Sequence, residues 1–239
     1  MSKKHLSKSA PRVRPLTWSK IGRAAKTQEL AFAKNPMVLY LQEYAPPENP
    51  IMSRIMLYLH FIRQIDSGVA LMVGNGDAVL LGIEPPSTSP PPSMLSKSIL
   101  RFQQWYNKRL YSPANPRFPA EGRRRVLEYQ KVVEKEESEA LGDAKDGMWY
   151  VNLLATRPDK QGKGYASALM HHFGTLADET PIWLHSSDYA NTGFYESLGY
   201  RVRAEAMLGV DNESWKHEPV HMTLMVKDRT DEKARYGLC

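Results

Sequence analysis

The stretch that most constrains the fold is a strand followed by a glycine-opened helix. Residues 148–156 are almost continuously apolar and predict a strand, which Pro158 prevents from continuing. Gly162 and Gly164 then open a helix predicted over 161–177. A further strand is predicted directly after this helix. Strands that alternate with helices favour an α/β fold with a parallel pair of strands at the centre of its sheet.

The start of this helix is a candidate phosphate site. The first amides of a helix have no intrahelical partner and carry partial positive charge, and glycines let a bulky anion approach them. Lys160 and Lys163 add full positive charges nearby. The segment lacks the Gly-Lys-Ser/Thr spacing of a Walker loop and the third glycine of the dinucleotide fingerprint. It therefore predicts an anion cradle of another kind.

The N-terminal half predicts an edge strand, two helices and a β-hairpin. The strand covers 12–17, and the first helix runs from Thr17 or Ser19 to about residue 33, where Asn35-Pro36 stops it. The second helix follows Pro50. Residues 69–73 and 78–83 form the hairpin around Asn75-Gly76, whose two turn residues are expected at positive φ. The remaining predicted elements are helices at 94–110, 121–141 and 191–198 and strands at 181–187, 199–208 and 220–226.

Composition and charge exclude several classes of protein. Hydrophobic residues make up 42% of the 239 residues, which excludes a disordered chain. Cys239 is the only cysteine, so an internal disulfide and a thiolate metal site are excluded, and we expect a cytoplasmic protein, with a nuclear or mitochondrial location left open. The net charge of +6 comes without a basic patch interleaved with aromatics, and no apolar run is long enough to span a membrane. We therefore expect neither a nucleic-acid nor a membrane partner.

Two sequence blocks resemble the GNAT superfamily of acetyl-CoA-dependent N-acetyltransferases. The Gln/Arg-x-x-Gly-x-Gly/Ala signature is matched by Gln161, Gly164 and Ala166. The Asn-x-x-Phe-Tyr-x-x-x-Gly-Phe/Tyr block is matched, in the expected order, by Asn191, Phe194, Tyr195, Gly199 and Tyr200. The N-terminal half shows a weaker resemblance, to the small-molecule branch that includes puromycin N-acetyltransferase.

The resemblance implies a domain organisation and a fold. It covers 12–226, interrupted by an insertion of about 87–146, and leaves a flexible basic tail at 1–11 and a C-terminal tail at 227–239. The implied fold is α/β, a mixed twisted sheet with helices on both faces, splayed central parallel strands, and a helical insertion between the hairpin and the central strand. The insertion is a lid, a dimer contact or filler, and the oligomeric state stays open.

The resemblance also implies an acetyl-CoA site without a metal. A bulge in the central strand would free backbone groups to pair with the pantetheine arm, and the diphosphate would lie on the amides at the helix start. The predicted cofactor-binding residues are Leu154, Ala155, Thr156, Gln161, Gly162, Lys163, Gly164, Tyr165, Ala166, Ser167, Asn191 and Tyr195.

The implied reaction is direct attack of a neutral amine on the thioester. Tyr195 stands at the family's general-acid position, although a core aromatic is the alternative. His185 is the candidate base. It either takes the proton directly, acts through a water, or is a core histidine. The puromycin branch usually has an acidic residue at this position. Glu29, Glu43 and Glu48 are competing bases.

Strand alternation gives the surroundings of the candidate base. It places Trp183, His185 and Ser187 on one face, and Met148, Tyr150, Asn152 and Leu154 on one face of the neighbouring strand.

The acceptor is expected to be a primary amine of a small molecule. The alternatives are a protein or peptide N-acetyltransferase and a non-catalytic acyl-CoA-binding module. Tyr40, Tyr44, Trp105 and Trp215 either line an acceptor pocket or pack in the core. The charges that alternate along 121–141 predict a solvated helix face, with a partner-binding helix as the alternative.

Overall fold

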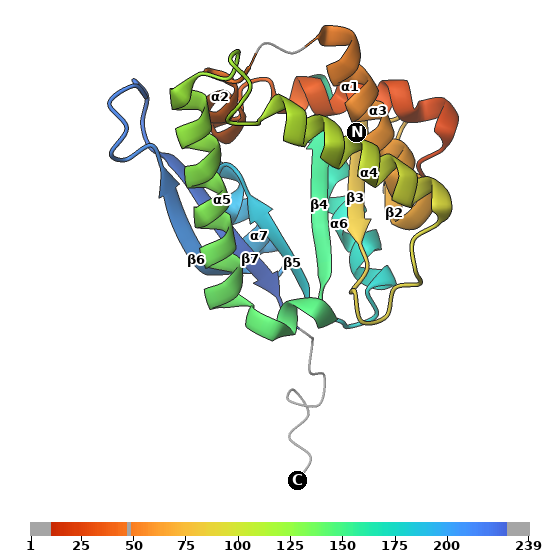
Figure 1. Cartoon of the computed structure of the whole chain (residues 1–239). Helices are drawn as coiled ribbons and strands as arrows, with labels where there is room; N and C mark the ends of the chain where they lie inside the picture. The colour runs from red at the N-terminus through yellow and green to blue at the C-terminus, as the bar shows by residue number, and fades with distance from the viewer. Residues whose placement is uncertain (1–10, 47–48, 229–239) are drawn as a thin grey trace, which may run out of the picture.

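A seven-stranded mixed sheet forms the centre of the computed structural model, which describes residues 11–46 and 49–228 (Figure 1). The strand order is β1-β2-β3-β4-β5-β7-β6, and only β4 and β5 are parallel. The predicted fold class is confirmed. The strands are β1 (Val13–Pro15), β2 (Val69–Val73), β3 (Ala78–Ile83), β4 (Trp149–Thr156), β5 (Ile182–Ser186), β6 (Arg201–Leu208) and β7 (Val220–Lys227).

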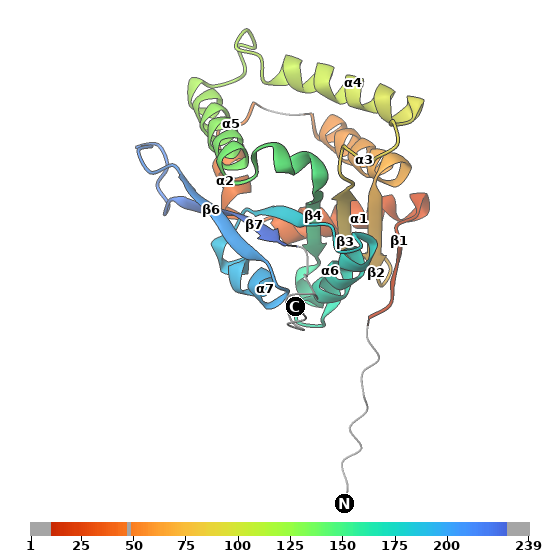
Figure 2. The same ribbon diagram turned by 90° about the horizontal axis from the view of Figure 1, so that it is seen from below.

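Helices cover both faces of this sheet (Figure 2). The first face carries α1 (Ile21–Phe32), α2 (Pro36–Gln42), α3 (Pro50–Ser67) and α5 (Ala120–Ala140), with α4 (Met94–Leu110) packed on α3. The second face carries α6 (Tyr165–Leu176) and α7 (Thr192–Ser197). Within the described ranges, no helix is both long and apolar enough to cross a membrane. The predicted tails fall almost wholly outside these ranges, so the domain limits stay predictions.

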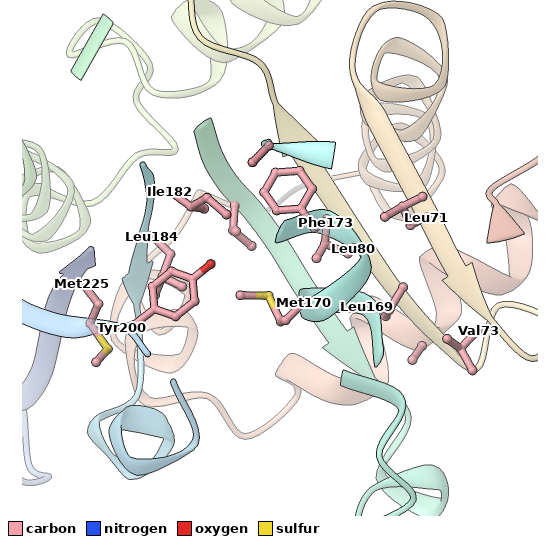
Figure 3. Packing of buried hydrophobic residues seen from close by; sticks show 13 residues of the cluster. Leu71, Val73, Leu80, Leu169, Met170, Phe173, Ile182, Leu184, Tyr200 and Met225 are labelled. Carbon is pink, nitrogen blue, oxygen red and sulfur yellow. The ribbon is translucent and has the colours of Figure 1, made fainter. Parts of the chain in front are cut away.

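A continuous apolar core lies between α6 and the sheet (Figure 3). Leu169 and Phe173 of α6 are fully buried against Leu80 of β3. Gly82 makes this packing possible, because a Cβ at that position would come within 2.1 Å of the Phe173 ring. The core therefore fixes α6, and with it the loop at its N-terminus, to the middle of the sheet.

The parallel strands β4 and β5 separate after three residue pairs. Pairing runs from Trp149↔Ile182 to Val151↔Leu184 and then stops. On its other edge, β4 stays paired with β3, but the register shifts because Leu81 faces Leu153 while Gly82 faces Val151. Asn152 is the extra residue, so β4 contains the implied bulge. The predicted splay of the central strands is thus confirmed.

The bulge changes which face the later residues of β4 occupy. Val151 and Leu154 both pack in the core beneath α6, whereas Leu153 and Ala155 pack beneath α1. The expectation that Leu154 shares a face with Tyr150 and Asn152 is therefore wrong. One extra residue reverses the alternation that a regular strand would have kept.

Three local predictions need correction. Asn35-Pro36 does not only stop α1: Asn35 accepts a hydrogen bond from the amide of Val38 at 3.1 Å and caps α2, in which Pro36 occupies the first position. In the hairpin, Gly74 and Gly76 adopt positive φ and Asn75 does not. Helix α6 begins at Tyr165 rather than at residue 161, since the preceding residues form an irregular glycine loop.

The charged helix α5 is not a fully solvated face. Arg125 is completely buried, and it donates hydrogen bonds to Glu121 at 2.8 Å, to Glu43 at 2.7 Å and to the Tyr40 carbonyl oxygen at 2.9 Å. Its guanidinium carbon also lies 4.6 Å, 4.7 Å and 5.2 Å from the ring centroids of Tyr40, Tyr44 and Trp215. This cluster joins α2, α5 and the loop after β6, so the second half of the insertion is a structural wall and not filler.

Replacing Arg125 tests this wall. We expect Arg125→Met to lower the free energy of unfolding by about 3 kcal/mol, because the partly buried Glu121 loses its buried counter-charge. Arg124→Met, at an exposed position that also pairs with Glu121, is the matched control and should cost less than about 1 kcal/mol. Urea unfolding of both variants is the measurement, and equal losses would contradict the assignment.

Candidate functional site

A cavity of about 1400 Å³ opens where β4 and β5 separate. It runs from the N-terminus of α6 to the helices on the first face of the sheet. The predicted site residues that line it are Leu154, Ala155, Thr156, Gln161, Gly162, Gly164, Tyr165, Ala166, Ser167, His185, Asn191 and Tyr195. Lys163 does not line it, because its ammonium donates to the Asp159 carbonyl oxygen at 3.2 Å; Lys160 lines the cavity instead.

One end of the cavity is built from backbone amides. Gly162 and Gly164 have φ values of 70° and 75°, which suit glycine and not other residues. The side-chain amide of Gln161 donates to the Thr156 carbonyl oxygen at 3.4 Å and so ties this loop to the end of β4. The first amides of α6 lack intrahelical partners and face the same end. The loop and helix start therefore fit an anionic diphosphate.

The edge of β4 beyond the bulge offers further unpaired groups. Because pairing with β5 stops at Val151, the later residues of β4 have no strand partner on that side. The hydroxyl oxygen of Thr156 is buried, and it finds no hydrogen-bond partner within the described part of the chain. A ligand with amides along an extended arm would satisfy such an edge.

Tyr195 lies on α7 beside the cavity. Its ring packs edge-on against Phe194 and Tyr200, with centroids 5.1 Å and 6.0 Å away. Burial raises the pKa of Tyr195 to about 12. The phenol is therefore protonated at neutral pH and can donate a proton.

The other end of the cavity is largely aromatic and aliphatic. Phe32, Met37, Leu57 and Tyr129 line it from the helices of the first face. Tyr150 of β4 lines it from the sheet and stacks on Trp183 of β5 with centroids 4.1 Å apart. Burial raises the pKa of Tyr150 above its ordinary value, so this phenol also stays neutral.

His185 lines the cavity and contacts two glutamates of α5. Its Nε2 lies 3.6 Å from Glu136 Oε2, and its Nδ1 lies 3.9 Å from Glu137 Oε1. The Glu136 side chain is only 6% exposed, which contradicts the solvated face predicted for this helix. The sequence held a signal: Glu136 falls at helical spacing on the buried stripe of α5 that includes Arg125, Tyr129 and Val132.

The other candidate residues separate into two groups. Glu29 lines the cavity but pairs with Lys26 at 3.1 Å, whereas Glu43 is engaged by Arg125 and Glu48 lies outside the described residues. Tyr40, Tyr44 and Trp215 pack around Arg125, and Trp105 is exposed on α4; none of these four lines the cavity. A group of three or more metal-binding side chains is absent from residues 11–46 and 49–228.

Residues 126–202, from within α5 to the start of β6, match the acetyltransferase (GNAT) domain family. The chain carries a GNAT acetyltransferase domain. The protein is thus an acyltransferase of the GNAT type, as the two sequence blocks predict. The narrower resemblance to the puromycin branch stays a prediction.

The similarity to known proteins covers most of the chain. An uncharacterised N-acetyltransferase of Schizosaccharomyces pombe is 26% identical over 221 residues, which cover 89% of this chain and 81% of the relative. The solved structure of Aedes aegypti arylalkylamine N-acetyltransferase 2 is 15% identical and superimposes with a TM-score of 0.59, covering 91% of this chain and 98% of the other. A Corynebacterium glutamicum protein described as histone acetyltransferase HPA2 and related acetyltransferase is 18% identical, with coverages of 92% and 97% and a TM-score of 0.53. These structures share the fold.

A half-buried histidine supports the bulge of the sheet from α3. The Nε2 of His60 lies 3.4 Å from the side-chain amide nitrogen of Asn152, the bulge residue. Burial, with a smaller contribution from Arg63, lowers the pKa of His60 to about 4. The imidazole is therefore neutral at pH 7 and can accept the amide hydrogen of Asn152.

This histidine makes stability depend on pH. The unfolded chain protonates His60 near pH 6.5 and the folded protein only near pH 4, so stability falls as the pH drops between these values. The expected loss at pH 4 is about 3 kcal/mol. His60→Gln should remove this part of the loss, and His171→Gln, at an exposed position on α6, should not. Urea unfolding at pH 7 and pH 4.5 measures the difference, and parallel losses in both variants would refute it.

Proposed function

We propose that this protein transfers an acetyl group from acetyl-CoA to a primary amine of a small molecule by direct attack in a ternary complex. The observation that carries the proposal is the continuity of the cavity. The glycine loop of α6 and the unpaired edge of β4 open into the same space as the aromatic end beyond the bulge. Two substrates can therefore meet at the point where β4 and β5 separate.

Backbone groups of this chain would hold the acetyl-CoA, which supplies the activated thioester. Leu154, Ala155 and Thr156 offer a strand edge for the two amides of the pantetheine arm. The amides from Gln161 to Ala166 receive the diphosphate, and Lys160 adds positive charge. An amide near Leu154 polarises the thioester oxygen, which lowers the activation free energy by about 3 kcal/mol.

Two side chains of the cavity wall would handle the protons. His185 takes a proton from the attacking nitrogen as the carbon–nitrogen bond forms. Tyr195, which is protonated because of its burial, donates a proton to the departing thiolate as the carbon–sulfur bond breaks. Both side chains line the same cavity.

The walls of the acceptor end favour a small molecule. Helices α1, α2, α3 and α5 contribute side chains to this end, so it is enclosed by several elements and not laid out along one open groove. The names of the similar structures include both an arylalkylamine and a histone acetyltransferase, so they do not favour one acceptor class. The proposal of a small molecule is therefore based on the walls of the cavity. With a single cysteine in the chain, we also propose a reducing, cytoplasmic location.

Tyr195→Phe separates an enzyme from a module that only binds acyl-CoA. We expect kcat to fall about 10²- to 10⁴-fold while the Kd for acetyl-CoA stays unchanged, because only the donated proton is lost. Tyr189→Phe is the matched control: this tyrosine is 49% exposed and stacks on His221, and its loss should leave the rate unchanged. Thiol release and calorimetric binding are the measurements.

A panel of acceptors completes this test. It holds arylalkylamines, aliphatic diamines and peptides with free N-termini, each assayed with the wild-type protein. Binding of acetyl-CoA without turnover of any acceptor would support the binding module. Turnover restricted to the peptides would overturn the small-molecule proposal.

A further inference from the structure

Helix α5 buries a carboxylate for which the mechanism above has no role. Glu136 is 5% exposed, and neither of its carboxylate oxygens has a hydrogen-bond partner within the described part of the chain. An ionised carboxylate without partners is costly to bury. The structure brings one ionisable group towards it: the Nε2 of His185, at 3.6 Å, which is also buried and without a hydrogen bond.

The other ionisable groups near Glu136 and His185 are either paired elsewhere or neutral. Glu137, the other carboxylate near His185, is paired with Lys145. The Lys145 ammonium lies 5.3 Å from the Trp183 ring centroid, and its side chain is 41% exposed. The phenols of Tyr129 and Tyr150 are neutral because burial raises the pKa of each.

Two further neighbours of His185 among the described residues are uncharged. On β7 it pairs with Leu224, and its ring packs edge-on against Trp183. Glu136 is therefore the unneutralised negative charge closest to the imidazole among the described residues.

We propose that Glu136 is a positioning residue that holds His185 as the proton acceptor for the amine; this rests on the proposed acetyl transfer. With its hydrogen on Nε2, on the side of Glu136, the imidazole keeps its lone pair on Nδ1. Nδ1 lies 3.9 Å from Glu137 Oε1, and the ring lines the cavity, so Nδ1 is the nitrogen left to take up a proton. A carboxylate behind an imidazole orients it and stabilises the imidazolium formed on proton uptake. Glu136 acts through His185 and does not touch the substrate.

The proton balance of the step is complete. The acceptor nitrogen bonds to the thioester carbon, and its proton moves to Nδ1 of His185. The carbon–sulfur bond breaks, and the thiolate takes the phenolic proton of Tyr195. The charges then present, an imidazolium beside Glu136 and a phenolate at Tyr195, are neutralised by exchange with solvent as the products leave.

The insertion thereby has a defined part in the reaction. Arg125 and Glu136 lie on the same buried stripe of α5, three helical turns apart. Arg125 fixes the helix over the sheet. Glu136 supplies a negative charge beside β5, where His185 stands in place of the acidic residue of the puromycin branch. Loss of Glu136 should therefore change the chemistry without dismantling the wall.

Kinetics of Glu136→Gln are the principal test. We expect kcat to fall about 10- to 100-fold at an unchanged KM for acetyl-CoA. The acidic limb of the kcat–pH profile should move to lower pH, since the imidazolium has lost its carboxylate. Glu136→Asp keeps the charge and should restore the wild-type profile in part. The control is Glu134→Gln on the exposed side of the same helix, which should change neither quantity.

A second variant and a second measurement keep the result interpretable. Glu136→Leu fills the buried site with an apolar side chain, which removes the cost of burying a charge, and it should show the same kinetic loss. The ¹⁵N shifts of the His185 imidazole, followed against pH without substrate, should move with Glu136→Gln even if no acceptor is turned over. This separates failure of the dyad from failure of the proposed function. Wild-type kcat in Glu136→Gln, or imidazole shifts that do not respond, would overturn the proposal.

Discussion

The bulge at Asn152 is the constraint on which the rest of the site depends. Seven strands could form a continuous sheet, but one extra residue in β4 breaks the register with β3 and ends the pairing with β5 at Val151. Backbone groups that would be satisfied by a neighbouring strand are thereby left for a ligand. His60 supports the arrangement from α3 by accepting the amide hydrogen of Asn152, which requires a neutral imidazole. The imidazole is neutral because burial lowers its pKa to about 4.

The two ends of the cavity are made from different materials. At the α6 end, the chain presents backbone: left-handed glycines, the first amides of a helix and a strand edge. At the other end it presents side chains from four helices and from strands of the sheet. The buried Arg125 cluster holds this second end together, since it connects α2 to α5 across aromatic rings. A charged interior of this kind stabilises only when its partners are complete.

This difference explains how much the sequence could predict. The glycine loop and the Asn191–Tyr200 block are local in the chain, and of the cofactor-binding residues predicted from them all but Lys163 line the cavity. The bulge was implied by resemblance, yet its effect on Leu154 was not, because alternation assumes a regular strand. Glu136 was assigned to solvent, since charge outweighed its place on the buried stripe of α5. Contacts between residues 49 positions apart, such as Glu136 and His185, have no local signature.

The placement of α5 links the insertion to the chemistry and not only to the shape of the site. A helix needed merely as a wall would bury apolar residues along its whole inner stripe, as Val132 does. Two charged residues stand on that stripe instead, and of the two only Arg125 has hydrogen-bond partners among the described residues. Glu136 does not, and a buried charge that the fold leaves incomplete is explained most economically by a step that completes it. Formation of an imidazolium at His185 is such a step, because it supplies the missing positive charge at the moment the amine loses its proton.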